Sequence, residues 1–172
     1  MRLSHDYKII YYSIPKTGSE TVRSFLDPVS DEGIVKFPEV DDTMPFYRYM
    51  RPFAVRKIFL GKGWNFDGYY KFATVRNPWA RLASLYNMTR RNWGGQWDVS
   101  FSEWIKSLDP TGRSTSNMSE KWYAHGTMSM VKFLSDQNGN ILVDTVFGLR
   151  IKPRPFTPIP KRAWVWIAFN AD

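Results

Sequence analysis

The chain has 172 residues, of which 43% are hydrophobic and 17% aromatic, so it is long enough to bury the core of one domain and too apolar for a disordered chain. Its formal net charge of +8 favours polyanionic partners such as nucleotides, acidic glycans, nucleic acids or anionic membranes. The absence of cysteine excludes disulfides, thiolate metal sites and a thiol nucleophile.

The amino terminus lacks the apolar stretch of a signal peptide, and no segment approaches the roughly 20 apolar residues of a membrane span. From these two observations we expect a cytoplasmic protein without a membrane span.

The first predicted element is a buried strand over residues 7–14, a segment rich in tyrosine and isoleucine. Pro15 ends this strand, and Gly18 permits a tight turn after it. A helix is predicted to begin at Ser19 and to stop at Asp27, which precedes a proline. The apolar residues that recur at helical spacing in it are Val22, Phe25 and Leu26.

Residues 28–50 are acidic and show no clear period, which indicates a loop with room for one short element. A helix is predicted from Pro52 to about Leu60. Residues 69–75 form the strongest strand prediction, because a nearly continuous apolar run is typical of a strand covered on both faces. A further helix is expected from Pro78 to about Arg91. Its apolar positions are Trp79, Leu82, Leu85, Tyr86 and Met88.

Later in the chain, Ser100 and Glu103 match a capping box at the start of a short helix. A helix over residues 122–134 and a strand over residues 141–147 follow, with a turn at 137–140 between them.

The alternation of strands and helices predicts an α/β fold with a parallel β-sheet flanked by helices. We expect one domain over residues 1–150, because no internal repeat and no second domain is visible. Residues 151–172 form a separate tail, rich in proline, basic residues and tryptophan, that does not continue the pattern.

The turn after the first strand, residues 14–21, has the composition of an anion-binding loop. The first N–H groups of a helix have no partners within it, and the helix dipole adds positive potential there. Gly18 allows a close approach of the backbone and Lys16 adds a charge. The hydroxyl donors are Thr17, Ser19 and Thr21. Taken alone, the segment is equally compatible with an ordinary strand–helix turn that carries a solvated lysine, and it lacks the Walker pattern.

A second candidate anion site lies sixty residues later. Arg76 ends the strongest strand, at the carboxyl edge where open α/β sheets bind their ligands. Ser84 follows two helical turns on, on the same side of the helix as Asn77 and Arg81. An arginine fork and a serine hydroxyl suit a phosphate group. The alternative is that Arg76 pairs with a carboxylate and Arg81 is solvated.

The two segments together resemble the sulfotransferases that use 3′-phosphoadenosine 5′-phosphosulfate. Residues 15–21 are similar to the family's loop for the 5′-phosphosulfate, and residues 75–86 are similar to its 3′-phosphate motif. The resemblance covers most of residues 8–150 and is closest to the branch that acts on carbohydrates and has many bacterial members. It implies a fold like that of the P-loop nucleotide hydrolases. The end of the chain departs from the family, which suggests a truncated or divergent carboxyl-terminal part.

For mechanism, the resemblance implies that Lys16 neutralises the leaving phosphate and the moving sulfuryl group. Arg76 and Ser84 would bind the 3′-phosphate. The backbone that would cradle the 5′ end belongs to Thr17, Gly18, Ser19, Glu20 and Thr21. The acceptor would be a hydroxyl group, on a saccharide for this branch, and no metal is required.

The general base is not evident from the sequence. Relatives often place a histidine just before the helix that begins here at Pro52, where this chain has Arg51. His125 is the best remaining imidazole, although a surface histidine is an equal interpretation. His5 lies too near the terminus. The acidic loop adds Glu39, Asp41 and Asp42 as weaker candidates.

Three other functions compete with a sulfotransferase. The departures at Arg51 and in the tail suit a catalytically degenerate module that binds nucleotides or polyanions without turnover. A P-loop kinase would need magnesium and a Walker-type lysine, which the sequence lacks. Binding of single-stranded nucleic acid would suit the basic and aromatic composition but has no recognised module in the chain, so no nucleic-acid partner is expected.

Overall fold

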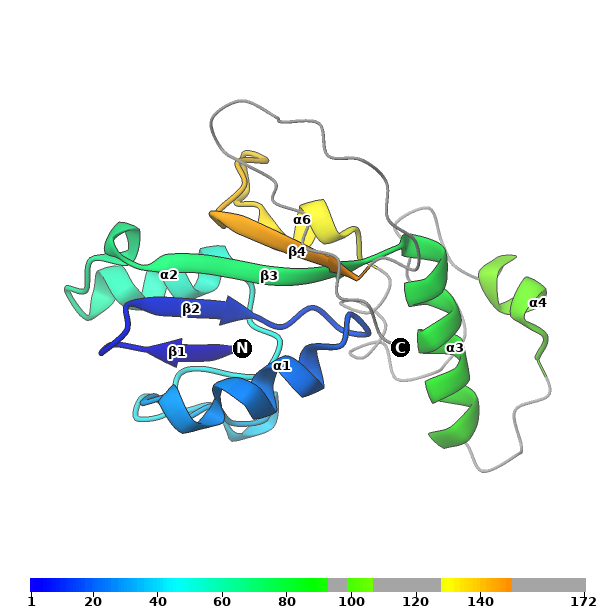
Figure 1. Cartoon of the computed structure of the whole chain (residues 1–172), viewed down its shortest axis with the longest axis horizontal. Helices are drawn as coiled ribbons and strands as arrows, with labels where there is room; N and C mark the ends of the chain where they lie inside the picture. Colours follow the sequence, from blue (N-terminus) through cyan, green and yellow to red (C-terminus); the bar gives the residue numbers. More distant parts are fainter. Residues whose placement is uncertain (93–98, 107–127, 150–172) are drawn as a thin grey trace.

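A computed structural model describes residues 1–92, 99–106 and 128–149. Its centre is a four-stranded sheet in which the strands stand in sequence order, β1-β2-β3-β4 (Figure 1). The strands are β1 (Arg2–Ser4), β2 (Ile9–Tyr12), β3 (Tyr70–Arg76) and β4 (Thr145–Leu149). β2, β3 and β4 run parallel to one another, whereas β1 pairs with β2 in the antiparallel direction.

Helices surround this sheet. In Figure 1, α2 and α6 lie behind the strands, α1 lies beside β1, and α3 extends beyond the carboxyl end of β3 with α4 next to it. The helices are α1 (Ser19–Leu26), α2 (Pro52–Gly61), α3 (Pro78–Asn92), α4 (Phe101–Lys106) and α6 (Met130–Leu134). Three short 3₁₀ turns are η1 (Asp27–Val29), η2 (Phe37–Glu39) and η3 (Phe66–Gly68).

The main core fills the space between the sheet and the pair α2 and α6. Alternate residues of the strands point into it, as the pleat of a sheet requires. Phe59 of α2 is fully buried at its centre, and its ring lies 5.0 Å from that of Tyr69 and 5.2 Å from that of Trp64. The sheet residues in this core are Leu3, Ile10, Tyr12, Ala73, Val75 and Val146.

A second, smaller core joins α3 to α4. Leu85 and Trp104 are buried there. The predicted capping box is confirmed at the start of α4. The Ser100 amide donates to the Glu103 carboxylate at 2.9 Å, and the Glu103 amide donates to Ser100 Oγ at 3.2 Å.

The predicted elements agree with the structure for α1, α2, β3 and α3, whose bounds differ from the expected ones by one or two residues. The strand expected over residues 7–14 is shorter, and the one expected over residues 141–147 begins only at Thr145. Ile141 instead forms an isolated antiparallel bridge with Ser135, because the turn between them brings the chain back on itself.

The sheet is mixed, which corrects the expectation of a purely parallel sheet. β1 was missed because three residues, Arg2 to Ser4, are too few to show a period, and their strand exists only through its pairing with β2. The helices flank the sheet as predicted.

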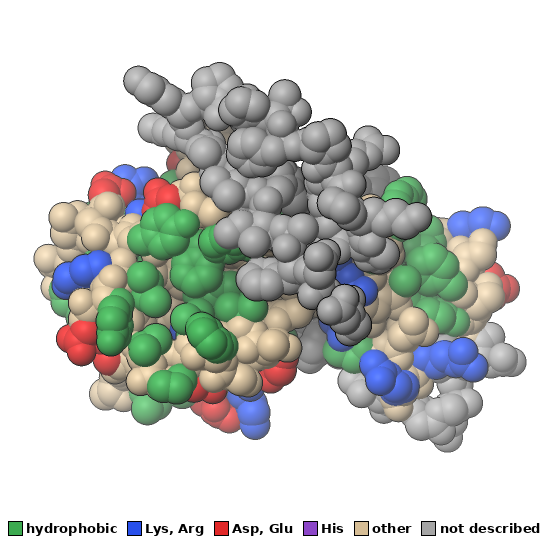
Figure 2. Space-filling view, in the orientation of Figure 1, with side chains coloured by type: hydrophobic (Ala, Val, Ile, Leu, Met, Phe, Trp, Pro, Cys, Tyr) green, Lys and Arg blue, Asp and Glu red, His purple; other side chains and the backbone are tan. Residues whose placement is uncertain are grey.

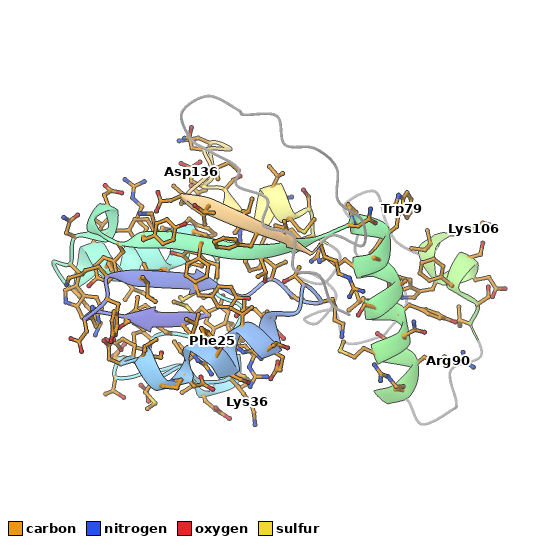
Figure 3. All side chains as sticks on the ribbon, viewed as in Figure 1. Phe25, Lys36, Trp79, Arg90, Lys106 and Asp136 are labelled. Atoms are coloured by element: carbon orange, nitrogen blue, oxygen red, sulfur yellow. The ribbon has the colours of Figure 1, made fainter. Side chains whose placement is uncertain are left out.

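The apolar face expected for α1 is also wrong in part. The Phe25 side chain is 83% exposed, whereas Arg23 is only 2% exposed and lies over the ring of Tyr49. Trp79, expected to pack under α3, is 70% exposed as well. Figure 3 labels both residues, Phe25 on α1 and Trp79 at the start of α3, and Figure 2 shows hydrophobic side chains on the visible face of the sheet body.

Two predictions lie outside the described residues. They concern His125 with the first part of its predicted helix, residues 122–127, and the tail, residues 151–172. Among the helices in the described ranges, none has the length and apolar character needed to cross a membrane.

Candidate functional site

The two predicted anion segments lie next to each other in the structure. β2 and β3 are adjacent parallel strands, so the chain leaves both at the same edge of the sheet. The Arg76 guanidinium donates from Nη1 to the carbonyl oxygen of Lys16 at 3.5 Å. The fold therefore joins segments that are sixty residues apart into one basic site.

The loop between β2 and α1 has an unusual backbone conformation. Lys16 has a φ of 67° and Gly18 a φ of 75°. Gly18 adopts this left-handed region freely, but a lysine there costs about 1–2 kcal/mol. The surrounding structure must therefore hold the loop in this conformation.

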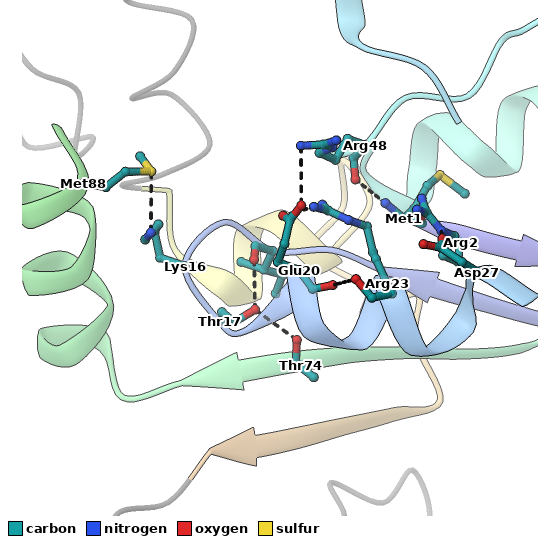
Figure 4. Close-up of polar contacts among 12 residues, drawn as sticks. Met1, Arg2, Lys16, Thr17, Glu20, Arg23, Asp27, Arg48, Thr74 and Met88 are labelled. Atoms are coloured by element: carbon teal, nitrogen blue, oxygen red, sulfur yellow. Dashed lines mark hydrogen bonds and ion pairs between the residues drawn. The ribbon is translucent and has the colours of Figure 1, made fainter. Parts of the chain in front are cut away.

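A chain of hydroxyl groups fixes the underside of the loop to the sheet (Figure 4). Thr17 is fully buried, and its Oγ1 donates to the carbonyl oxygen of Ile14 at 2.9 Å and lies 3.0 Å from Oγ1 of Thr74. Thr74 Oγ1 in turn lies 2.8 Å from the hydroxyl of Tyr11, and burial raises the pKa of Tyr11 to about 12. The Thr17 hydroxyl is thus hydrogen-bonded inside the protein, so any contact of Thr17 with a ligand would come from its backbone.

The start of α1 has no side-chain cap among the described residues. Gly18 is the N-cap residue of this helix. At α3 the situation is different, because Asn77 Oδ1 accepts hydrogen bonds from the amides of Trp79 and Ala80 at 3.0 and 3.2 Å. A phosphate would therefore find uncapped amides at α1 rather than at α3.

The exposed carboxylate of Glu20, in the first turn of α1, lies close to two arginines. The Glu20 carboxylate is paired with Arg23, and it lies 3.9 Å from Nη1 of Arg48 (Figure 4). These arginines offset a negative charge that would otherwise repel an anion at the loop. Ser19 is buried and Thr21 is exposed.

Lys16 extends from the loop toward α3. Its Nζ donates to Sδ of Met88 at 3.5 Å, and Met88 lies one helical turn after Ser84. A thioether is a weak acceptor, so the ammonium can exchange this contact for a phosphate oxygen. Burial, followed by the nearby charges of Arg91 and Arg76, lowers the pKa of Lys16 below its ordinary value.

Ser84 is half-buried on the face of α3 that Lys16 approaches. Arg76, at the end of β3, is also half-buried. The structure therefore brings Lys16 next to Arg76 and to the face of α3 that carries Met88 and Ser84.

Arg81 departs from both of its sequence interpretations. It is only 4% exposed, and its guanidinium donates to the carbonyl oxygens of Pro15 at 2.9 Å and Met128 at 2.8 Å. Burial lowers its pKa to about 10. It is therefore buried and hydrogen-bonded to the backbone instead of solvated, and its spacing from Arg76 carries no signal that distinguishes it from an exposed arginine.

Arg51 stands where the resemblance led us to expect a histidine, and its side chain has a structural role. Its Nη2 donates to the carbonyl oxygens of Lys132 at 2.7 Å and Ser135 at 3.2 Å, so it links the start of α2 to the end of α6.

The acidic candidates are engaged locally or exposed. The carboxylate of Glu39 accepts a hydrogen bond from the amide of Lys36 at 3.0 Å. Asp41 accepts from Thr43 Oγ1 at 2.7 Å, and this hydrogen bond is the main reason that its pKa is lowered. Asp42 is exposed. His5 contacts Tyr69 and Glu32 at the amino edge of the parallel strands, away from the Lys16 loop.

Within the described ranges, no three His, Asp or Glu side chains gather closely enough to hold a metal ion. Among known protein families, the one described as "Sulfotransferase family" has a model that matches residues 1–128. The chain matches no curated protein and no solved structure.

Proposed function

The chain belongs to the sulfotransferase family, and on this premise we propose that it transfers a sulfuryl group from 3′-phosphoadenosine 5′-phosphosulfate to a hydroxyl group of a saccharide. One observation carries the choice of donor. The loop with Lys16 and the segment with Arg76 meet at one sheet edge, where Arg76 contacts the Lys16 carbonyl at 3.5 Å. Two cationic segments in contact suit a nucleotide that carries a phosphate at each end.

In this proposal the 5′ end of the donor binds at the start of α1. The backbone of residues 17–21, whose first amides are uncapped by side chains of the described residues, surrounds the phosphosulfate. Lys16 leaves the Met88 sulfur and approaches the bridging oxygen between phosphorus and sulfur. The 3′-phosphate binds to Arg76 and Ser84.

The reaction needs charge stabilisation and in-line positioning more than covalent help. The acceptor oxygen forms a bond to sulfur while the bond between sulfur and the 5′-phosphate oxygen breaks. The electron pair of that bond stays on the phosphate, where the Lys16 ammonium stabilises the added charge. The acceptor proton passes to a general base, for which we propose His125.

Titration calorimetry with 3′-phosphoadenosine 5′-phosphate tests the donor site, with adenosine 5′-phosphate as the comparison ligand. We expect the 3′-phosphate to improve affinity roughly 10- to 100-fold, since hydrogen bonds to charged groups contribute about 1.5–3 kcal/mol. Arg76→Ala should remove this preference, and Lys16→Ala should weaken both nucleotides.

Arg56→Ala is the matched control, because Arg56 is exposed on α2 and the substitution removes the same charge away from the site. Equal affinity of the unaltered protein for both nucleotides would contradict the proposal.

The alternative of a binding module without turnover rests on Arg51, since a guanidinium bonded to backbone carbonyls cannot accept a proton at neutral pH. Incubation with the sulfated donor and a panel of glycans separates the two functions. Transfer of sulfate that is lost in His125→Ala supports the enzyme and the base. Tight donor binding without transfer to any glycan favours the module.

A further inference from the structure

Arg81 is a buried cation whose hydrogen bonds reach two other segments of the chain. Its Nε donates to the Pro15 carbonyl oxygen at 2.9 Å, and its Nη1 donates to the Met128 carbonyl oxygen at 2.8 Å. The residue is only 4% exposed. A guanidinium is costly to bury, so these bonds are part of what keeps it in place.

The two carbonyl groups belong to different parts of the molecule, the Lys16 loop and the main core. Pro15 immediately precedes Lys16, whose left-handed conformation needs external support. Met128 precedes α6 and packs against the main core. Through one side chain, α3 is therefore attached both to the Lys16 loop and to the body of the domain.

The fork geometry of the side chain matters here. A guanidinium presents donors in two directions within one plane, whereas a lysine ammonium on a flexible stem cannot hold two carbonyl oxygens in the same arrangement. With its pKa at about 10, Arg81 is charged at neutral pH and retains all of its donors.

These contacts have a consequence for the two halves of the site. Lys16 belongs to the loop after β2, and Ser84 belongs to α3, one turn after Arg81. A nucleotide with two phosphates gains from both halves only if their separation is already correct before binding.

We propose that Arg81 is a positioning residue that sets the separation between the 5′ and 3′ phosphate sites by joining α3 to the Pro15 carbonyl. This inference rests on the proposed function. It concerns how the site is held together and assigns Arg81 no contact with substrate.

Calorimetry on Arg81→Met and Arg81→Lys tests the effect on ligands. The probes are 3′-phosphoadenosine 5′-phosphate, adenosine 5′-phosphate and adenosine 3′-phosphate. We expect Arg81→Met to reduce the advantage of the doubly phosphorylated nucleotide over each singly phosphorylated one about tenfold, with Arg81→Lys intermediate, because one charged hydrogen bond to the loop is worth roughly a factor of ten.

Arg90→Met is the control, since Arg90 is exposed near the end of α3 and the variant loses the same charge (Figure 3). A loss of affinity that is equal for all three nucleotides, or no loss at all, would overturn the inference.

Hydrogen exchange without nucleotide gives a second readout that is independent of the proposed function. In Arg81→Met, amides of residues 16–19 should exchange faster than in the unaltered protein, while those of α2 should not change. If the unaltered protein shows no preference for the 3′-phosphate, the proposed function fails, and this measurement still decides the role of Arg81. Unchanged exchange of the loop amides would overturn the positioning role of Arg81. If Arg81→Met does not fold, the same measurement is made on Arg81→Lys.

Discussion

The hydroxyl chain beneath the Lys16 loop shows how single residues hold a candidate anion-binding loop in place from its inner side. Thr17 turns its hydroxyl toward Ile14 and Thr74, and the backbone on the other side of the loop is left for a ligand. A threonine hydroxyl can form its hydrogen bonds within the protein or with a ligand, and the sequence is compatible with both. Only the structure reveals which of the two applies.

Thr17→Val should destabilise the protein by about 1–3 kcal/mol, because the variant has nearly the same shape but leaves the Ile14 carbonyl and the Thr74 hydroxyl short of a partner. Urea unfolding measures the change. Thr21→Val, at an exposed position of the same helix, should change stability by less than about 0.5 kcal/mol. Equal effects of the two substitutions would show that the hydroxyl chain does not stabilise the loop.

Lys16 gives a prediction about pH. The ammonium is charged below its pKa, so affinity for 3′-phosphoadenosine 5′-phosphate should fall as pH rises through that pKa. Because burial and neighbouring arginines lower the pKa of Lys16, this fall should begin at a lower pH than for an ordinary lysine. Calorimetry between about pH 7 and pH 9, below the pKa of about 10 of Arg81, measures it.

Lys16→Arg provides the comparison, because an arginine keeps its charge throughout this range. Any nucleotide affinity that this variant retains should be nearly independent of pH. A parallel decline in both proteins would assign the titration to another group.

At the scale of elements, the packing of each helix decides which of its faces is apolar. For α2, the sequence period and the structure agree, and Phe59 is fully buried while its neighbour Leu60 is 67% exposed. For α1, they disagree, since an arginine is buried and Phe25 is exposed. A helix of eight residues has too few apolar positions for its period to outweigh charge pairs such as Arg23 with Glu20.

Phe59→Ala should cost about 3–5 kcal/mol of unfolding free energy, because it empties the centre of the aromatic core between α2 and the sheet. Leu60→Ala changes the next residue of the same helix and should cost less than about 0.5 kcal/mol. Urea unfolding of both variants provides the comparison. Similar costs would mean that α2 packs through a different face.

On the scale of the whole molecule, the excess of positive charge and the location of the candidate site are separate properties. The net charge of +8 is spread over the chain, and basic side chains occur on several parts of the surface in Figure 2. The candidate site is distinguished by a local arrangement, in which Lys16 and Arg76 meet at the start of α1, whose N-terminus has no side-chain cap among the described residues.

Salt should therefore weaken binding in proportion to the charge of the nucleotide. Between about 0.05 and 0.5 M salt, affinity for 3′-phosphoadenosine 5′-phosphate should fall more steeply than affinity for adenosine 5′-phosphate, because the distance over which exposed charges attract one another shortens from about 10 Å at 0.1 M to roughly 3 Å at 1 M. Calorimetry at several salt concentrations measures both slopes. Identical slopes would indicate that the additional phosphate does not contact the cations of the site.

The sequence by itself determined the order of the main strands and helices and the sulfotransferase resemblance, and it singled out two candidate anion segments, because these depend on local period, turn residues and motif spacing. Residues 15–21 and 75–86 carry the motifs of this resemblance. The family model matches residues 1–128, a range that includes both segments.

Only the tertiary structure decided the antiparallel edge strand β1, the inward direction of the Thr17 hydroxyl and the burial of Arg81. Each of these depends on a partner that is distant in sequence: β2 for the strand, Thr74 for the hydroxyl, and the Pro15 and Met128 carbonyls for the guanidinium. Pairing across such distances leaves no local period in the chain, because it is decided by which backbone and side-chain groups the fold buries together.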